Sequence, residues 1–389
     1  MRFKKQILSI LLLLTFLFTG CQSAVNPAEE GSDVYAIAEI QKYGNLLLSI
    51  SGTEFMEDGY TCGDIITAEI NGTAYDMPIG SNYADVDEGN AVCRIAINPA
   101  EEKDCVILAI NMGDLATDSG LAIKTETKEE PGYRWDVTEG ASLEISISMK
   151  EQGGYYDEYI LRQLQRTNER TDYPHLTDAE FANFRPITTT GMGEGKLYRS
   201  SSPINPKLGR NTYADAALQE AGIRTILNLA DAEETMQSYE SWSESNYSSR
   251  AIIPLNMSLD FQAEDFQEKL AEGLRFLAAN EGPYLLHCTE GKDRAGFTSA
   301  VLECLMGASP EEVSADYMVS YFNYYGVTPG SEQYTTIAKS NIEKSLATAF
   351  EIESIYADDV DLAAEASAYL REKLGLTADE IAAVKANLS

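Results

Sequence analysis

One stretch between residues 283 and 298, PYLLHCTEGKDRAGFT, constrains the fold of this chain more than any other. Its apolar part, Tyr284 to Leu286, follows a Gly-Pro break and predicts a short buried strand. The apolar residues from Phe297 to Met306 predict a helix. The residues between them therefore form a loop from a strand end to a helix N-terminus, and this loop carries a cysteine and an arginine separated by five residues.

The loop has the composition of an oxyanion-binding site. The first backbone N–H groups of a helix lack partners within the helix and its dipole is positive there, so this terminus holds anions. Cys288, beside the helix terminus and Arg294, is expected to be a thiolate nucleophile. Arg294 can donate two parallel hydrogen bonds to a phosphoryl group, while Gly291 and Gly296 allow close backbone approach. His287 is expected to order the loop by hydrogen bonding. The pattern predicts phosphoryl transfer through a phosphocysteine, with no metal ion and no cofactor.

The segment from His287 to Arg294 resembles the H-C-x-x-G-K-D-R loop of the bacterial atypical protein tyrosine phosphatases, a dual- and lipid-specific branch of the cysteine phosphatase superfamily. The resemblance includes residues 183–185, 195–200 and 222–229, and it extends over residues 155–389. It implies a phosphoric monoester hydrolase with Cys288 and Arg294 as catalytic residues. The substrate-binding residues that it implies are Thr289, Glu290, Gly291, Lys292, Asp293 and Arg199, although Arg199 and Arg185 could instead form structural ion pairs.

Two observations keep a non-catalytic interpretation open. A cysteine and an arginine at this spacing also arise by chance, and a cysteine behind an apolar strand is often an inert core residue. The family usually has Thr or Ser directly after the arginine, where the hydroxyl assists the departing thiolate, whereas this chain has Ala295. Breakdown of the phosphocysteine is therefore expected to be slower, with Thr289 and Thr298 as nearby hydroxyl groups.

Strands and helices are predicted to alternate in the part of the chain that contains this loop. Residues 224–230 and 251–255 predict strands, and residues 264–279 predict a helix with one apolar face. Such alternation indicates an α/β domain with a central, mostly parallel sheet flanked by helices, in which ligands bind beyond the carboxyl ends of the strands. Cys288 lies at such an end.

Cleavage of a phosphate ester needs a proton for the leaving oxygen. Asp260 is our candidate for the general acid, because it lies in the loop after the strand 251–255, roughly where the resemblance places the acid. Asp260 could instead cap the following helix. The alternative acids are Asp293, Asp231 and Asp265.

The pattern of residues 34–150 is different, with short β-branched and aliphatic runs separated by turn residues such as Asn71-Gly72. These runs lie at 34–40, 45–50, 64–70, 91–97, 105–110 and 142–148. They predict a small antiparallel β domain, a sandwich or a barrel, ahead of a phosphatase domain at 155–389. Cys62, Cys93 and Cys105 could include one disulfide or be free buried thiols.

The first 21 residues have the features of a bacterial lipoprotein signal peptide. Basic residues precede an apolar run from 7 to 18, and small residues precede Cys21 as in a lipobox. Cleavage and lipidation at Cys21 would leave residues 22–33 as a tether and place the protein on the extracytoplasmic face of the cell membrane; an ordinary secretory signal is the alternative. The 62 acidic residues against 29 basic ones give a net charge of −33, which argues against nucleic-acid partners.

The predicted function is a cysteine-dependent phosphatase with phosphotyrosine or dual specificity. Phosphoinositides are further candidates, because Lys292 adds a positive charge to the loop. The alternatives are an inositol polyphosphate phosphatase resembling the cysteine phytases, and a surface binding lipoprotein whose phosphatase domain is silent. The predicted partners are a phosphorylated protein, phosphoinositide or inositol phosphate substrate, and the membrane through the lipid anchor.

The lipid anchor predicts that Cys21→Ala releases the protein from the membrane fraction or stalls its processing, because the thiol is the site of lipid attachment. Fractionation of cells that express each form measures this. A Cys21→Ala protein that is processed and remains bound to the membrane contradicts the lipobox interpretation.

Overall fold

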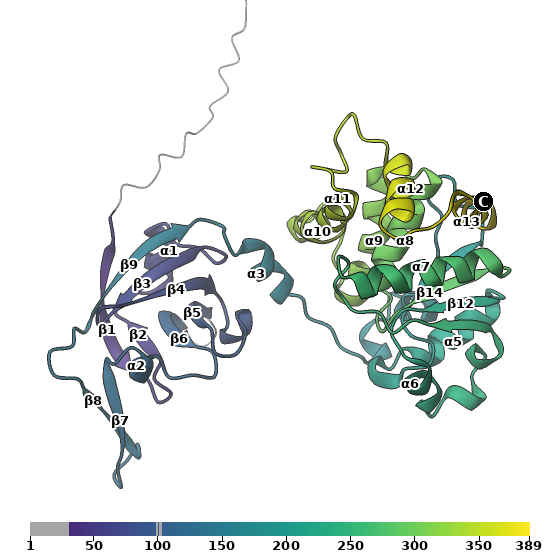
Figure 1. The fold of residues 1–389 in the computed structure, drawn as a ribbon. Helices are drawn as coiled ribbons and strands as arrows, with labels where there is room; N and C mark the ends of the chain where they lie inside the picture. Colours follow the sequence, from purple (N-terminus) through teal and green to yellow (C-terminus); the bar gives the residue numbers. More distant parts are fainter. Residues whose placement is uncertain (1–30, 99, 101–102) are drawn as a thin grey trace, which may run out of the picture.

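The computed structural model describes residues 31–98, 100 and 103–389, so the predicted signal peptide and Cys21 lie outside the described residues. The described chain contains a β-rich part, purple to blue in Figure 1, and a mixed α/β part, teal to yellow. Helix α3 (Tyr156–Arg162) lies on the chain between them.

Strands of the β-rich part form a closed barrel in the order β1-β2-β6-β5-β4-β3-β9. Its strands are β1 (Asp33–Ile40), β2 (Leu46–Leu48), β3 (Ile65–Ile70), β4 (Thr73–Gly80), β5 (Ala91–Asn98), β6 (Lys103–Ile110) and β9 (Glu144–Glu151). Phe55, Ile66, Met77 and Ile147 are among the side chains that fill the interior, and each is fully buried. A small barrel filled in this way is a packed core and not a channel.

The prediction of an antiparallel domain is correct for most of the barrel and wrong for one pair of strands. β4 and β5 run parallel, with Ile79 opposite Cys93 and Gly80 opposite Arg94. The ten residues between these strands, which include the short helix η1 (Tyr83–Asp85), place the start of β5 beside the end of β4 and in the same direction. A tight hairpin turn would have made this pair antiparallel.

Three strands of this part have no counterpart among the predicted runs, namely β4, β7 (Ala122–Glu126) and β8 (Tyr133–Val137). Pro78 interrupts the pattern of β4, and charged residues interrupt β7 and β8, which form a separate hairpin. The short helices α1 (Gly52–Glu57) and α2 (Leu115–Asp118) complete this part. The cysteines at 62, 93 and 105 are free thiols in the structure.

The α/β part is built on a five-stranded sheet in the order β10-β11-β14-β12-β13. The strands are β10 (Arg185–Pro186), β11 (Leu197–Ser200), β12 (Thr225–Asn228), β13 (Ala251–Pro254) and β14 (Tyr284–His287). The last four run parallel and only β10 is antiparallel, which confirms the predicted mostly parallel sheet. β14 is the central strand, paired with β11 on one side and β12 on the other.

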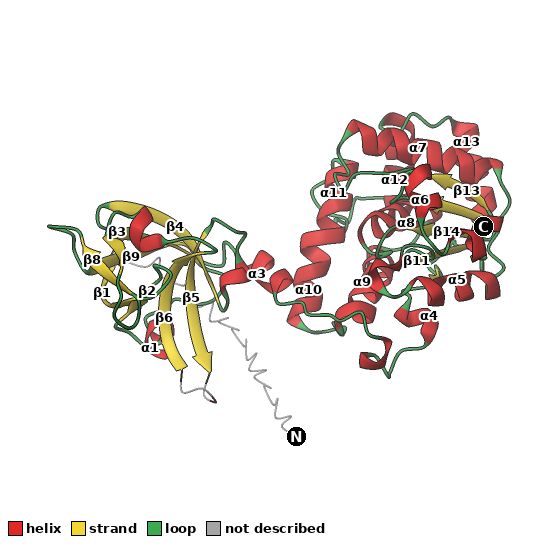
Figure 2. Ribbon diagram, turned by 90° about the horizontal axis from the view of Figure 1, so that it is seen from below, coloured by secondary structure: helices red, strands yellow, loops and turns green. Residues whose placement is uncertain are grey.

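Helices cover both faces of this sheet (Figure 2). Leu286 and Leu227 belong to one buried cluster, together with residues of α7 (Glu264–Ala279) and α8 (Asp293–Met306), whereas Leu285 and Ile226 belong to another. Adjacent strand residues point to opposite faces, so each strand contributes to both clusters. The first face is also covered by α9 (Pro310–Tyr325), α12 (Leu362–Glu372) and α13 (Ala378–Leu388), and the second by α5 (Asn211–Glu220) and α6 (Glu233–Ser238).

Helix α3 contacts both parts of the chain. The Tyr155 hydroxyl donates to the Asp85 carbonyl at 2.8 Å, and Arg162 forms a 3.0 Å ion pair with Asp87, so this segment is fixed to η1 of the barrel. On its other side α3 packs against α10 (Glu332–Ala338), which continues through residues 339–343 into α11 (Lys344–Phe350).

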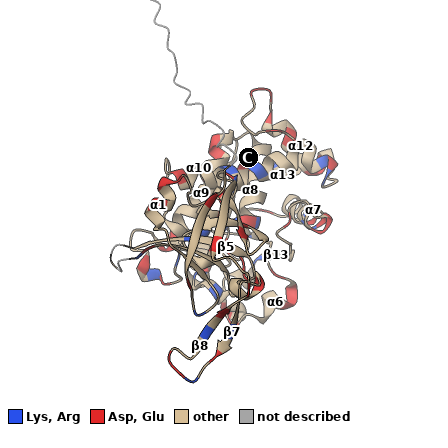
Figure 3. Ribbon diagram, turned by 90° about the vertical axis from the view of Figure 1, so that its left-hand side faces the viewer, with Lys and Arg blue, Asp and Glu red and all other residues tan. Residues whose placement is uncertain are grey.

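Acidic side chains recur on the outer helices, for example on α6 and α7 (Figure 3). Within the described ranges, the helices are too short or too polar to cross a bilayer.

The separate cores of the barrel and the α/β part predict that residues 155–389 fold and act without the barrel. A protein that begins at Tyr155 should unfold cooperatively in urea and turn over p-nitrophenyl phosphate at a rate similar to that of the full chain. If this shorter protein unfolds cooperatively but has no activity, the barrel contributes to the site and the proposed boundary is wrong.

Candidate active site

Cys288 directly follows the central strand β14, and its side chain is buried. The predicted strand and helix around it are both confirmed, but α8 begins at Asp293, four residues before the predicted start at Phe297. Arg294 therefore lies in the first turn of the helix. Cysteine and arginine are brought to the carboxyl edge of the parallel sheet, the edge at which such folds bind ligands.

The backbone carbonyl groups of the loop are bound from outside it. The donors are Ser202 N to Thr289 O (3.2 Å), Tyr324 Oη to Glu290 O (2.8 Å), Asn183 Nδ2 to Glu290 O (3.1 Å) and Gly291 O (3.3 Å), and Arg199 Nη2 to Gly291 O (3.0 Å) and Lys292 O (3.2 Å). With its carbonyl groups held outward, the loop can direct N–H groups toward its centre, which is the arrangement of an anion-binding nest.

Two glycines are required by the close packing behind the loop. Gly291 has φ +69°, and a Cβ atom there would lie 2.1 Å from the carbonyl oxygen of Ser200. A Cβ atom on Gly296 would lie 2.7 Å from the ring of Tyr317 and 2.8 Å from Arg199. The loop and the first turn of α8 can therefore approach β11 and α9 only because both positions lack a side chain.

Arg294 holds the surrounding loops with one end of its guanidinium group. Its Nη1 donates to the carbonyls of Leu229, after β12, at 3.3 Å and of Met257, after β13, at 2.9 Å. Its buried Nε has no hydrogen-bond partner among the described residues, and Nη2 lies 3.5 Å from the Thr289 hydroxyl. The Nε and Nη2 donors form the edge of the guanidinium group that can bind two oxygens of one phosphoryl group.

His287 is buried and neutral beneath the loop. Burial lowers the pKa of its imidazole to about 4, and Tyr247 Oη lies 2.8 Å from Nε2. The other ring nitrogen, Nδ1, lies 3.4 Å from the Cys288 carbonyl oxygen. A neutral ring that accepts from Tyr247 and donates toward Cys288 supports the loop, as the sequence predicts, and does not carry a positive charge to the site.

Arg199 does not face the site, which corrects its prediction as a substrate-binding residue. Its side chain is fully buried and forms a 2.7 Å ion pair with Asp316, which also binds Arg185 at 3.1 Å. It also donates to the carbonyls of Gly291 and Lys292 and to the hydroxyl groups of Ser299 and Ser320. The structural alternative is therefore the correct one, because a phosphate ligand could reach Arg199 only through the loop that it supports.

The charged side chains of the loop interact with one another. Glu290 forms a 2.6 Å ion pair with Arg166 and lies 3.4 Å from Lys292, and Lys292 lies 3.9 Å from Asp293. Thr289 lies beside Arg294. Arg166, Asn183 and Tyr324 were not predicted as site residues. Asn183 belongs to a segment that carries the family resemblance, whereas nothing in the sequence around Arg166 indicates a contact with a loop 124 residues away.

The structure separates the four candidate acids. Asp260 is exposed in the loop after β13, and its carboxylate accepts from Gln262 N at 3.0 Å. It does not cap α7, whose N-cap is Ala263. Asp265 is paired with Lys269 on the surface of α7, and Asp231 is buried with hydrogen bonds from Tyr239 and Asn228.

Asp293 is the only one of these candidates inside the loop, in the first turn of α8. Burial raises the pKa of its carboxyl group, and the neighbouring Lys292 only partly opposes this effect. A raised pKa suits a proton donor, so Asp293 is the strongest competitor of Asp260.

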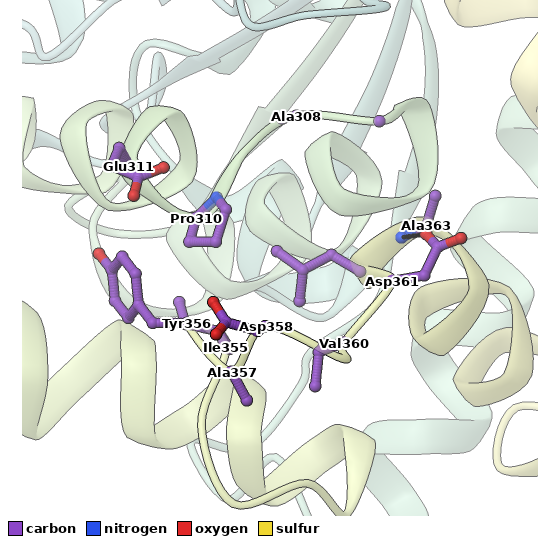
Figure 4. Close-up of a pocket in the computed structure, with 12 residues that line it drawn as sticks. Ala308, Pro310, Glu311, Ile355, Tyr356, Ala357, Asp358, Val360, Asp361 and Ala363 are labelled. Carbon is purple, nitrogen blue, oxygen red and sulfur yellow. Dashed lines mark hydrogen bonds between the residues drawn. The ribbon is translucent and has the colours of Figure 1, made fainter.

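A surface hollow of about 460 Å³ lies far from this loop. It is lined by Gly307 and Ala308 after α8, by Pro310 and Glu311 at the start of α9, and by residues 355–358 and 360–363 (Figure 4). Since α8 runs from the loop to this hollow over 14 residues, the two are about 21 Å apart. The hollow is not part of the site.

Comparison with known proteins agrees with this geometry. Residues 180–389, more than half of the chain, match the tyrosine phosphatase family. The chain belongs to this family. The matched region contains the sheet, the loop and the helices that support it, whereas Arg166 and the barrel lie outside it.

A tyrosine-protein phosphatase of Nostoc commune is 28% identical over 147 residues, which cover 32% of this chain and 50% of that protein. The chain thus spans half the length of this relative. Among solved structures, the core catalytic domain of the PP-IP phosphatase SIW14 from S. cerevisiae matches with 18% identity and a TM-score of 0.26, over 43% of this chain and 91% of that one. An uncharacterized conserved protein from Thermotoga maritima matches with 17% identity and a TM-score of 0.21, over 30% and 35%.

Asp260 as general acid predicts a selective defect in Asp260→Asn. Alkyl phosphates have poor leaving groups that need protonation, so their hydrolysis should fall by about 100-fold or more, while that of an activated aryl ester falls far less. The kcat/KM values for p-nitrophenyl phosphate and for an alkyl phosphate measure this, because they report the step in which the leaving oxygen departs.

Asp293→Asn, Asp231→Asn and Asp265→Asn are the matched controls for this measurement. If Asp260→Asn slows both substrates equally, or if Asp293→Asn shows the selective loss, Asp260 is not the acid.

Proposed function

We propose that this protein hydrolyses phosphomonoesters through a covalent phosphocysteine at Cys288. The observation that carries the proposal is that one loop contains both a buried cysteine and the Nε and Nη2 edge of Arg294, while its carbonyl groups are held outward. This arrangement offers donors to the three equatorial oxygens of a phosphoryl group and a nucleophile below its phosphorus atom. It supports transfer chemistry more directly than simple anion binding, which does not need a thiol.

In the first step the Cys288 thiolate attacks phosphorus in line with the bond to the leaving oxygen. The S–P bond forms and the P–O bond breaks, and the leaving oxygen takes the electron pair together with a proton from the general acid. In the second step water attacks phosphorus and gives its proton to the same carboxylate. The S–P bond breaks, so inorganic phosphate leaves and the thiolate is restored.

The second step lacks the usual hydroxyl group after the arginine, because Ala295 occupies that position and is fully buried. Thr298 follows one helical turn later, and its buried hydroxyl has no hydrogen-bond partner among the described residues. We infer that breakdown of the phosphocysteine is slow relative to its formation. The presence of both Cys288 and Arg294 in the loop supports an active enzyme over a silent binding protein.

The substrates that we propose are phosphotyrosine and related phosphomonoesters of proteins. Phosphoinositides and inositol polyphosphates share the reaction, but their extra phosphates need further cations, and Lys292 is already paired with Glu290 and Asp293. We also propose that the protein acts at the extracytoplasmic face of the membrane through a lipid on Cys21. That part of the proposal comes from the leader sequence and depends on the Cys21→Ala experiment.

The mechanism predicts that Cys288→Ser lowers hydrolysis of p-nitrophenyl phosphate by at least about 1,000-fold but retains binding of orthophosphate, because the loop amides and Arg294 remain. Calorimetric titration with orthophosphate measures binding. Cys105→Ser, a change of the same type in the barrel, should be as active as the wild type. Comparable turnover by Cys288→Ser rules out a cysteine nucleophile.

A further inference from the structure

The catalytic loop is bordered by a chain of four alternating charges. Arg166 Nη2 lies 2.6 Å from one carboxylate oxygen of Glu290, and Lys292 Nζ lies 3.4 Å from the other. Lys292 Nζ also lies 3.9 Å from Asp293. Glu290 therefore binds two cations, one on each side of its carboxylate.

Aromatic rings of α9 hold both cations in place. The Arg166 guanidinium lies 5.1 Å from the ring centre of Tyr324 and 5.8 Å from that of Tyr325. Lys292 Nζ lies 5.3 Å from the Tyr325 ring centre and 3.4 Å from its hydroxyl oxygen. These contacts restrict both side chains and add cation–π attraction to the ion pairs.

The charge chain is partly shielded from water. The exposed fractions of the side chains are 24% for Arg166, 22% for Glu290 and 13% for Lys292. Burial disfavours the charge of Glu290, but Arg166 and Lys292 outweigh burial and lower the pKa of its carboxyl group. Burial likewise disfavours the charge of Lys292, yet the nearby carboxylates and tyrosines raise the pKa of its ammonium group. All three groups are thus charged at neutral pH, in surroundings that screen ion pairs less than an open surface does.

From this geometry we propose that Glu290 determines substrate specificity, because it neutralises Arg166 and Lys292 and so makes the site select substrates with a single phosphate. The inference rests on the proposed function and names its substrate class. The two cations and the two carboxylates of the chain cancel beside the loop, whereas Arg294 presents its donors to the reacting phosphate. A second phosphate on the same small molecule would meet the carboxylate of Glu290 instead of an accessible cation, which opposes its binding.

Arg166 is the part of this device that the family region does not contain. It lies in the segment between α3 and the short helix η3 (Arg170–Asp172), and the matched region begins at residue 180. The segment that joins the barrel to the catalytic part therefore contributes a side chain to the border of the active site. Under this proposal, specificity depends on the contact between Arg166 and Glu290, two residues that are 124 positions apart in the sequence.

Glu290→Gln tests the proposal, because it keeps the size of the side chain and frees both cations. Orthophosphate and myo-inositol hexakisphosphate are compared as competitive inhibitors of p-nitrophenyl phosphate hydrolysis by the full chain. The ratio of their inhibition constants should shift by about tenfold toward the hexakisphosphate in the variant, and high salt should reduce the shift. Glu281→Gln removes a carboxylate that pairs with Arg224 on the exposed surface, and it should leave the ratio unchanged.

The double variant Arg166→Gln with Glu290→Gln retains the net charge of the wild type and removes both partners of one ion pair, which destabilises a fold less than removal of one partner. It frees only Lys292, so its shift should have the same sign and a smaller size. An unchanged or reversed ratio in a folded Glu290 variant, or the same shift in Glu281→Gln, overturns the proposal. Such a result leaves the proposed chemistry intact as long as hydrolysis still requires Cys288.

Discussion

The active site depends on hydrogen bonds that hold the carbonyl groups of one loop from behind. A loop of this length has no ladder or helix partner for its carbonyl groups, and buried carbonyl groups without partners are costly. Arg199 and Asn183 provide many of these partners, and Arg199 is itself neutralised by Asp316. The buried Arg199 charge is thus stabilised by one carboxylate and by the backbone that it orders. Its loss would leave Asp316 with Arg185 as its remaining ion-pair partner and would remove a donor from the carbonyls of Gly291 and Lys292. Gly296 lets the Arg199 side chain approach, because a Cβ atom there would lie 2.8 Å from Nη2.

Arg294 connects this loop to the neighbouring strands. Its Nη1 binds the carbonyls that follow β12 and β13, so the guanidinium position depends on the same sheet edge that places Cys288. The contact at Met257 lies in the loop that also carries Asp260. Arg294, which we propose binds the phosphate, therefore also contacts the segment that contains the candidate acid, so we expect substrate binding and the position of Asp260 to be coupled.

The sequence predicts those features that depend on neighbouring residues, and it does not predict those that depend on distant ones. The strand, the loop and the helix around Cys288 are local, and the alternation of elements is sufficient to predict a parallel sheet. The role of Arg199 depends on Asp316, 117 residues later, and on the pairing of β11 with β14. Arg166 contacts the loop because the segment between α3 and η3 lies against α9. In the barrel, β4 and β5 are parallel because the connection that contains η1 joins them without a hairpin turn. Such an irregular connection has no periodic sequence pattern from which the strand direction could be predicted.

The covalent intermediate is the central claim, and it can be observed directly. The enzyme is mixed with p-nitrophenyl phosphate, quenched in acid within milliseconds, digested and analysed by mass spectrometry. The account predicts a phosphate adduct on the peptide that contains Cys288, at a high steady-state fraction because Ala295 slows the second step. A protein that turns over many equivalents of substrate, with no adduct on Cys288 at any time after mixing, would contradict it.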